Sequence, residues 1–541
     1  MLSLKVNGEA VELPDDFAIT FNLKSPIFNE VGSFSYPFKI LRTPRTQKIL
    51  GFRDRIESTQ DPYQDFTGEF FWNGITGPAG ALRCKIANDK FYEGTMYERE
   101  GDFYYQLKNK NLQHIDLGSL SFADENLALY YINLSTYKYY PDVPCAFPTI
   151  GNIAYFDPAT EDPELREYNP YQDITGLIYL QSQLGNRTII VPMLYLKYVL
   201  GKVFAGIDHS FDDQLFLHED FNRLVLYNSL SCNDALKDIS YKVDNILFNL
   251  HVPFISIGDF LKGIENLWAS RFFVDNKTNH VRLIPLKDVI ADETYIEWSD
   301  NILSKSTELE EQVKGYHLKM ELDPDDTRLD SITRFEDILL DYFKGSVDTI
   351  ADLPPFPQAN IFDVRYVISE KEMWQLRNNK VWTAAPWINN FLRTQFIFRD
   401  SAEKVDMKFS TLYGDNFYVE CENKLENWMD ITSRAFFVDQ YLVGTHFMYG
   451  RNSTGNFNLL FDGGSSQSPN DPFYTYWRSF LEWRIGTRLV KVQKQMTFLE
   501  INDIDFSKKY RIHGINYLIK SIRVTVNATR LKPATIELYK I

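Results

Sequence analysis

The clearest pattern of apolar and polar positions along the chain lies in residues 255–290. Ser256 can cap a helix with Asp259 three residues later, which is a carboxylate variant of the capping box. Apolar side chains then recur at helical spacing, at Phe260, Leu261, Ile264, Leu267 and Trp268. Two short apolar runs follow, on either side of a polar turn at 275–279. The pattern predicts a helix that leads into a β-hairpin, a packing module without clustered catalytic groups.

The first hundred residues alternate between apolar and polar positions as β-strands do. Asn7-Gly8 separates two such stretches and predicts a two-residue hairpin turn, because both central positions of that turn need a positive φ. Residues 17–23 alternate cleanly. From 66 to 107, short apolar runs are separated by turns that contain Gly, Asn or Asp. This spacing predicts a small barrel or sandwich.

Prolines shape the predictions for three further segments. Residues 32–41 predict a strand in which Pro37 favours an edge position, and a short helix toward Leu50 follows. Pro192 can occupy the first turn of a helix that ends near Gly206. The apolar stripe of that helix, which favours a core position over a cofactor site, consists of Leu196, Val199, Leu200, Val203 and Phe204.

The second half of the chain predicts mixed strands and a final β module. The predicted strands of the mixed region are 315–322, 363–368, 394–398 and 416–420. A Gly- and Ser-rich loop at 463–469 precedes a short aromatic helix over 473–481. The strands of the final module are 508–512, 517–526 and 534–540. Ile522, Val524 and Val526 share one face of a half-exposed strand.

These elements predict an α+β fold that is mainly β, with small β-barrel or sandwich domains and inserted helix–hairpin α/β modules. A chain of 541 residues exceeds the size, roughly 250 to 300 residues, at which single cores stop growing. We therefore expect five regions. They are an N-terminal β-barrel-like domain (1–115), a Tyr- and Pro-rich insertion or arm (116–190), an α/β module (191–300), a mixed β region with loops (301–465), and an aromatic helix with a C-terminal β module (466–541).

Composition narrows the classes of partner. The formal charge of −16 argues against a nucleic-acid backbone as the main partner, although a local basic patch stays possible. Aromatic residues make up 15% of the chain, which suits many strands and large contact surfaces. The four cysteines are scattered without a C-x-x-C pair, so neither a disulfide scaffold nor a zinc ribbon is indicated.

The N-terminus carries no basic stretch followed by an apolar one, and no apolar run reaches about 18 residues. We expect a protein made in the cytoplasm, without a secretory signal or a membrane span.

Catalytic and metal-binding patterns are missing. The sequence has no G-x-S-x-G elbow, no phosphate-binding loop, no G-x-G-x-x-G and no H-E-x-x-H. His209 and His218, with Asp212 and Asp213 between them, come nearest to a metal cluster, but we interpret them as ordinary polar loop residues. The acidic turn at 323–326 lacks the Gly and Glu of a calcium loop. We therefore predict no catalytic, cofactor-binding or metal-binding residue and no enzyme, while a pair of carboxylates distant in sequence stays open.

Three stretches together resemble virion tail proteins of bacteriophages that infect Bacteroidota. They are 13–52 (LPDDFAITFNLKSPIFNEVGSFSYPFKILRTPRTQKILGF), 255–286 (ISIGDFLKGIENLWASRFFVDNKTNHVRLIPL) and the ending from Trp477 to Ile541. More distantly, the layout is similar to the baseplate-hub family. The resemblance implies small β-barrels around an axial channel, with inserted α/β modules, in a ring-shaped homo-oligomer that is usually a trimer. It transfers no functional residue.

The resemblance implies a structural protein of the virion tail, hub-like, at the tail tip or baseplate, in a ring around the DNA channel. A trimer is favoured, and rings of six or twelve are possible. Expected partners are tube, spike or fibre proteins and, transiently, DNA. Alternatives are an adaptor or ring of a phage neck or short tail, and a glycan-binding or glycan-degrading receptor-binding protein. Aromatic residues of the 130–175 segment suit either contacts between subunits or packing within the chain.

Overall fold

The structure is a computed structural model. It describes the following parts of the chain. Continuous stretches cover 2–28, 33–52, 65–98, 110–148, 190–230, 245–308, 343–385 and 472–541, apart from positions 87, 124, 136–137, 213, 229, 276–277, 368, 371 and 528–529. Residues 107, 150–151, 167–169, 171–174, 177–180, 232, 316–320, 396–397, 403–407, 415–416, 435–440, 446–449 and 459 are also described. The fold is α+β and mainly β, as predicted.

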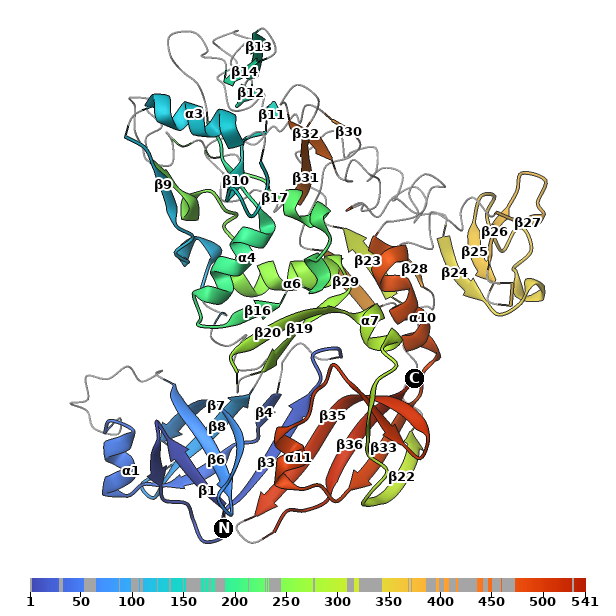
Figure 1. Ribbon diagram of the computed structural model, residues 1–541. Coiled ribbons are helices and arrows are strands. Elements are labelled where there is room, and N and C mark those ends of the chain that lie inside the picture. The colour runs from blue at the N-terminus through green and yellow to red at the C-terminus, as the bar shows by residue number, and fades with distance from the viewer. Residues whose placement is uncertain are drawn as a thin grey trace.

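One sheet of 14 strands holds both ends of the chain. Its path runs through β2 (Glu9–Val11), β1 (Leu2–Val6), β6 (Phe66–Trp72), β7 (Ile75–Ile86), β8 (Phe91–Glu98), β4 (Ser33–Ser35), β3 (Ala18–Lys24), β35 (Ile515–Asn527), β36 (Ala534–Lys540), β33 (Leu489–Lys494) and β22 (Ile302–Glu308). Three strands pair off this path: β5 (Phe38–Leu41), β34 (Lys509–Ile512) and β21 (Tyr295–Glu297). In Figure 1 the blue N-terminal strands and the red C-terminal strands lie side by side.

The predicted turns and strands of this sheet are largely confirmed. Asn7 and Gly8 have φ of 49° and 81° and join β1 to β2. Ile522, Val524 and Val526 are buried on one face of β35, as predicted. The prediction of a single strand over 32–41 is wrong in one respect. Tyr36-Pro37 divides this segment into β4 and β5, and both strands pair with β8. Proline has no N–H to donate and breaks the ladder there.

A closed barrel is not found among the described strands. In the N-terminal half, Leu41 N donates to Glu12 O at 3.0 Å, but no strand ladder joins β5 to β2. In the C-terminal half, β21 pairs with β34 and β22 with β33, yet β21 and β22 do not pair. Instead the two halves join laterally through β3 and β35, so the path has β2 and β22 at its ends.

The central α/β module confirms the predicted helix and hairpin. Helix α6 (Ile257–Leu267) begins after Ser256, whose Oγ accepts from Asp259 N at 3.0 Å. The hairpin is β19 (Ser270–Asp275) with β20 (His280–Pro285), and β16 (Ser210–Asp212) adds in parallel to β20. Glu265 ties the two parts together, since its Oε1 accepts from Phe272 N at 2.9 Å.

The predicted helix after Pro192 forms, but Pro192 lies outside it. β15 (Met193–Leu194) comes first, and α4 (Leu196–Ala205) begins after Tyr195 and ends at Gly206. Its predicted apolar stripe is buried. Pro192 O instead accepts from Asn228 Nδ2 at 3.1 Å, so this residue belongs to an extended segment held by a side chain.

The 116–190 insertion contains a helix that its pattern did not predict, α3 (Glu125–Ser135). Ala128 and Ile132 are buried, whereas Leu127 and Tyr130 are exposed, so apolar residues occupy both sides and give no clean helical stripe. Its short strands are β9 (Ser119–Ser121), β10 (Cys145–Ala146), β11 (Ile150–Gly151), β12 (Glu167–Tyr168), β13 (Tyr171–Ile174) and β14 (Leu177–Leu180).

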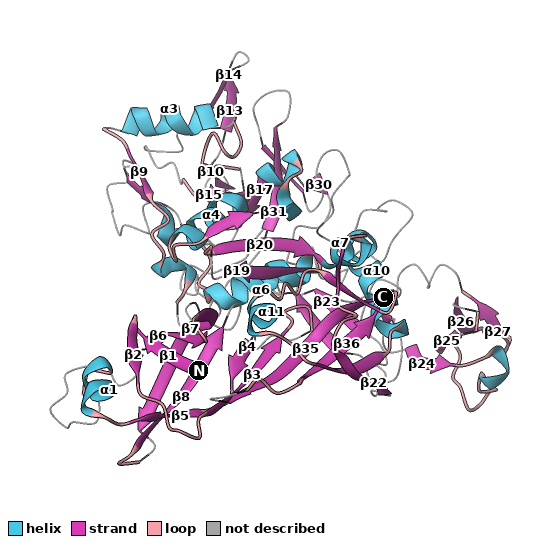
Figure 2. Cartoon of the chain, turned by 60° about the horizontal axis from the view of Figure 1, so that its bottom comes forward, coloured by secondary structure: helices cyan, strands magenta, loops and turns pink. Residues whose placement is uncertain are grey.

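The remaining strands form small separate sheets. β24 (Phe343–Val347), β25 (Val364–Val367), β26 (Glu372–Leu376) and β27 (Trp382–Ala384) make one lobe, which both views place to the side of the body (Figures 1 and 2). A three-stranded sheet contains β23 (Tyr316–Met320), β28 (Phe396–Ile397) and β29 (Glu403–Met407). A four-stranded sheet contains β17 (Leu224–Leu226), β31 (Ala435–Gln440), β32 (His446–Tyr449) and β30 (Asp415–Asn416). In a two-stranded sheet, β18 (Asn245–Leu247) pairs with β9.

Short helices complete the described chain. They are α1 (Pro44–Ile49), α7 (Leu286–Ala291), α10 (Arg478–Gly486) and α11 (Phe498–Asn502), the π-helix η9 (Phe473–Trp477), and the 3-10 turns η1 (Leu112–His114), η4 (Gln214–Phe216), η5 (Glu219–Arg223), η6 (Phe248–Leu250) and η7 (Ile350–Asp352). The aromatic helix expected over 473–481 thus forms as η9 followed by α10. No described helix has the length and apolar character needed to cross a membrane.

Candidate functional site

The candidate metal residues from the sequence are engaged locally. His209 Nδ1 lies 2.7 Å from Ile207 O, and His218 caps η5 with its Nδ1 3.2 Å from Asp220 Oδ2. Within the described residues, no group of three His, Cys, Asp or Glu side chains could hold a metal ion. The acidic turn at 323–326 lies outside the described residues.

Cys84, Cys145 and Cys232 lie in the described chain, where each is a buried thiol outside any disulfide. Burial raises the pKa of the Cys145 and Cys232 thiols far above their usual range. Because the thiolate is the nucleophile, these two side chains behave as small apolar residues of the core.

A buried polar cluster joins Asn228 to His251 in the α/β module. Asn228 Nδ2 donates to Pro192 O at 3.1 Å and to Leu230 O at 3.0 Å, and its Oδ1 accepts from Leu230 N at 3.0 Å. His251 Nδ1 lies 3.0 Å from Asn228 Nδ2 and 3.2 Å from Leu230 O, so it either accepts from the amide or donates to the carbonyl, according to its tautomer. Burial lowers the pKa of His251 to about 4, which keeps the ring neutral.

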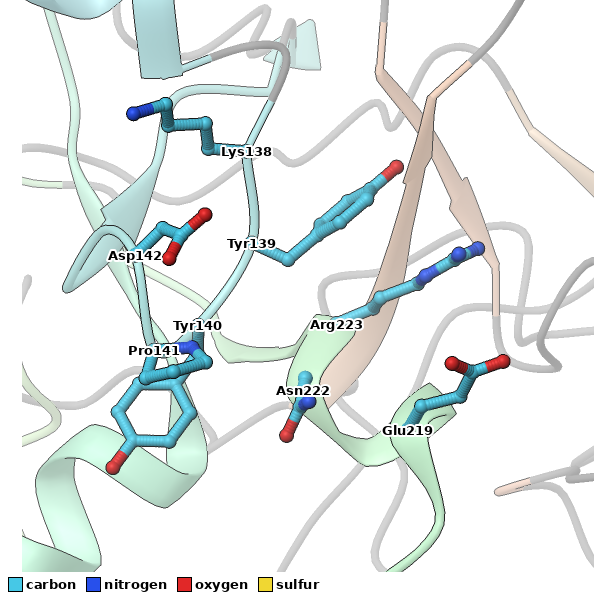
Figure 3. A pocket seen from close by; sticks show the side chains of 8 residues that line it. All are labelled: Lys138, Tyr139, Tyr140, Pro141, Asp142, Glu219, Asn222 and Arg223. Atoms are coloured by element: carbon cyan, nitrogen blue, oxygen red, sulfur yellow. The ribbon is translucent and has the colours of Figure 1, made fainter.

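A pocket of about 250 Å³ lies between the 138–142 turn and η5. Figure 3 shows the turn residues on one side and the η5 side chains on the other. Its lining residues are Lys138, Tyr139, Tyr140, Pro141, Asp142, Glu219, Asn222 and Arg223. The pocket therefore joins the 116–190 insertion to the central module.

Local contacts hold both walls of this pocket. Asp142 N donates to Tyr139 O at 2.9 Å and closes the turn, while Tyr195 OH donates to Lys138 O at 3.3 Å and fastens the turn to α4. On the opposite wall, Phe221 of η5 is buried against Phe216 and Trp268, with ring centroids 5.1 and 5.9 Å away. Because the Phe221 ring packs into the core, the side chains of Glu219, Asn222 and Arg223 in η5 line the pocket.

Arg223 connects the two walls. Its guanidinium carbon lies 4.6 Å from the centroid of the Tyr139 ring, which is within the range of a cation–π contact. Both residues are half-buried. This contact fixes the width of the pocket across two segments distant in sequence.

Four further polar side chains line the pocket, and in Figure 3 those of Lys138 and Glu219 extend to opposite sides. In the described part of the chain, the side chains of Lys138, Asp142, Glu219 and Asn222 make no hydrogen bond or ion pair. Asp142 and Glu219 are exposed.

The sequence did not single out any of these pocket residues. The run Tyr-Tyr-Pro-Asp at 139–142 lies within the Tyr- and Pro-rich arm, and 219–223 directly follows His218. No periodic signal connects two segments about 80 residues apart that meet only in the fold.

No protein-family model and no curated protein matches this chain. Among solved structures, it is similar to the 43 kDa tail protein of prophage MuSo2 from Shewanella oneidensis, at 7% identity and a TM-score of 0.34, over 99% of this chain and 95% of that one. It is also similar to a tail protein from Neisseria meningitidis MC58, at 8% identity and a TM-score of 0.31, with 99% and 95% covered. TM-scores this low carry no functional conclusion.

Proposed function

We propose that the chain is a structural, non-enzymatic component of a bacteriophage tail. It is a hub-like protein of the tail tip or baseplate, and it assembles into a ring around the DNA channel. One observation carries the proposal: the two ends of the chain pair in one sheet, with the α/β module inserted between them. Thr20 Oγ1 and Thr525 Oγ1 lie 2.9 Å apart across that junction. The inserted α/β module agrees with the hub resemblance, whereas the closed barrels that it implies are not found among the described strands.

The junction of the two ends is extensive. β3 pairs with β35 from Ala18 opposite Asn527 to Lys24 opposite Ser521, and Phe21 is fully buried opposite Val524. Burial of each such side chain contributes about 1.5 to 3 kcal/mol. The two β halves are therefore joined by a buried strand pair, which suits a scaffold under mechanical load.

Helix α11 and strand β7 form a second contact between the two ends of the chain. The Phe498 ring of α11 lies against β7, where a Cβ on Gly77 would come within 2.0 Å of it. The same ring is 6.3 Å from Trp72. Glycine at position 77 thus allows a C-terminal helix to pack directly onto an N-terminal strand.

A free sheet edge supports assembly into a ring. Within the described residues, β22 pairs with β33 on one side and ends the sheet path on the other. Residues 303–306 of this edge are exposed, and the Leu303 side chain is 58% exposed. An unpaired edge with an apolar side chain offers a neighbouring subunit both backbone and apolar contacts.

The mass of the purified protein in solution, measured by light scattering, tests the ring. We expect three copies, seen as a closed ring in electron micrographs of the same peak. Leu303→Lys should shift the population toward monomer, because it places a charge at the proposed contact. Leu217→Lys is the matched control, since Leu217 is 74% exposed between η4 and η5 of the central module.

A folded wild-type monomer at about 10 µM, a concentration above the Kd of most stable interfaces, would contradict the ring. Six or twelve copies would favour the adaptor or neck ring over the tail tip. Mass spectrometry of purified particles of the encoding phage tests the virion location independently, since a tail component must be present in them.

The remaining parts of the proposal concern partners. Tube, spike or fibre proteins would contact the ring, and DNA would pass through it transiently. The net charge of −16 suits a channel wall that repels phosphate. Synthesis in the cytoplasm of the host bacterium precedes assembly.

A further inference from the structure

We propose that the pocket between the 138–142 turn and η5 binds one sugar unit of a neutral glycan. The inference does not rest on the tail role proposed above, because it is argued from the pocket's own side chains. It assigns a ligand class to a site in which the side chains of Lys138, Asp142, Glu219 and Asn222 have no partner among the described residues.

The charges of the pocket balance. Lys138 and Arg223 supply two cations, and Asp142 and Glu219 supply two carboxylates. An anionic ligand such as a phosphate would face both carboxylates, and a cationic one would face both basic groups. A neutral ligand avoids both repulsions.

The hydrogen-bonding groups of the pocket match a ligand that carries hydroxyl groups. The two carboxylates only accept, the Lys138 ammonium only donates, and the Asn222 amide does both. A hydroxyl group donates and accepts, so a ligand with several hydroxyls can bond to whichever of these groups it reaches without carrying a net charge. In the described residues these groups have no internal partner, and a ligand would complete them.

The aromatic wall suits the apolar face of a sugar ring. Tyr139, Tyr140 and Pro141 line the pocket beside the polar groups, and both tyrosines are half-buried. Arg223 holds the Tyr139 ring from one direction. Mixed apolar and convergent polar groups are the usual composition of a small-molecule site.

The size of the pocket limits the ligand. A volume of about 250 Å³ lies just below the range of roughly 300 to 1,000 Å³ of drug-sized sites. A single sugar unit of a longer chain fits such an open hollow. A peptide would instead use a sheet edge or a groove, where its backbone can be paired.

Isothermal titration of the full chain with maltohexaose, cellohexaose, chitohexaose and mannohexaose tests the proposal. We expect at least one to bind. The double variant Asp142→Asn/Glu219→Gln should weaken that binding at least about tenfold, because neutral amides replace charge-assisted acceptors. The single variant Asn222→Ala should weaken it by a similar factor, because it removes the amide's hydrogen bonds to the ligand. Glu9→Gln is the matched control, because Glu9 is an exposed acid on β2, outside the pocket, and its variant should bind as the wild type does.

Titration with the corresponding monosaccharides tests whether the ligand is a unit of a longer glycan or a free sugar. If it is a unit of a glycan, the hexasaccharide should bind more tightly than the monosaccharide. The proposal fails if none of the four binds up to about 10 mM, the weak end of specific recognition. It also fails if the pocket variants bind as the wild type does, or if inorganic phosphate displaces the sugar. Oligomeric state is measured separately, so failure here leaves the ring proposal intact.

Discussion

Two polar clusters lie in the same half of the molecule and differ in one respect. The Asn228–His251 cluster is buried, and its amide is bonded on both the oxygen and the nitrogen. In the described residues around the pocket, Glu219 and Asn222 instead have side chains without internal partners. A buried polar group must be satisfied within the fold, whereas an exposed one is satisfied by water until a ligand replaces it. The first cluster therefore holds the fold, and the second is free to bind.

The largest effect is expected from removing the centre of the buried cluster. Asn228→Ala leaves the backbone groups of Leu230 and the carbonyl of Pro192 without their partner. Each unsatisfied buried group costs about 1 to 3 kcal/mol, so we expect a loss of roughly 3 kcal/mol in the free energy of unfolding. Urea denaturation measures it. The same change in the pocket, Asn222→Ala, is the matched control, and an equal loss in both variants would remove the distinction between the clusters.

An effect of similar size is expected from acid. His251 has a pKa of about 4 in the folded chain, against a usual 6.5. Between these values the unfolded chain binds a proton that the folded chain does not, so the stabilisation is complete above pH 6.5 and is lost as the pH falls toward 4. The loss amounts to roughly 3 kcal/mol over this window.

Denaturation of the wild type and of His251→Gln across this pH window isolates the effect, because the variant lacks the titrating group. Nuclear magnetic resonance of the histidine ring protons reports the pKa directly. A ring that titrates near its usual value would show that His251 is not a buried, neutral member of the cluster.

The smallest effect on stability is expected in the pocket. Asp142→Asn/Glu219→Gln replaces two exposed carboxylates with amides of the same shape, so the free energy of unfolding should stay within about 0.5 kcal/mol of the wild type. Thermal and urea unfolding measure this. A large loss would mean that these carboxylates hold the two walls together, and the contrast with the buried cluster would narrow.

Much of the fold was predictable because its signals are local. The turn at Asn7-Gly8 follows from the need for positive φ, and α6 follows from a cap at Ser256 and an apolar stripe. The break at Pro37 could not be predicted from local pattern alone, because it depends on the neighbouring strand β8, which pairs with both β4 and β5. Helix α3 was missed because its apolar residues do not gather on one face, and packing rather than periodicity decides its place.

The sequence by itself determined the β character of both ends, the helix–hairpin between them and the scarcity of catalytic patterns, because each depends on residues within about one element of each other. Tertiary structure decided that β3 pairs with β35, that Phe498 packs on Gly77, and that the 138–142 turn meets η5. Those contacts join segments tens to hundreds of residues apart. Their partners are chosen by the burial of apolar faces in the whole fold, and no local pattern records that choice.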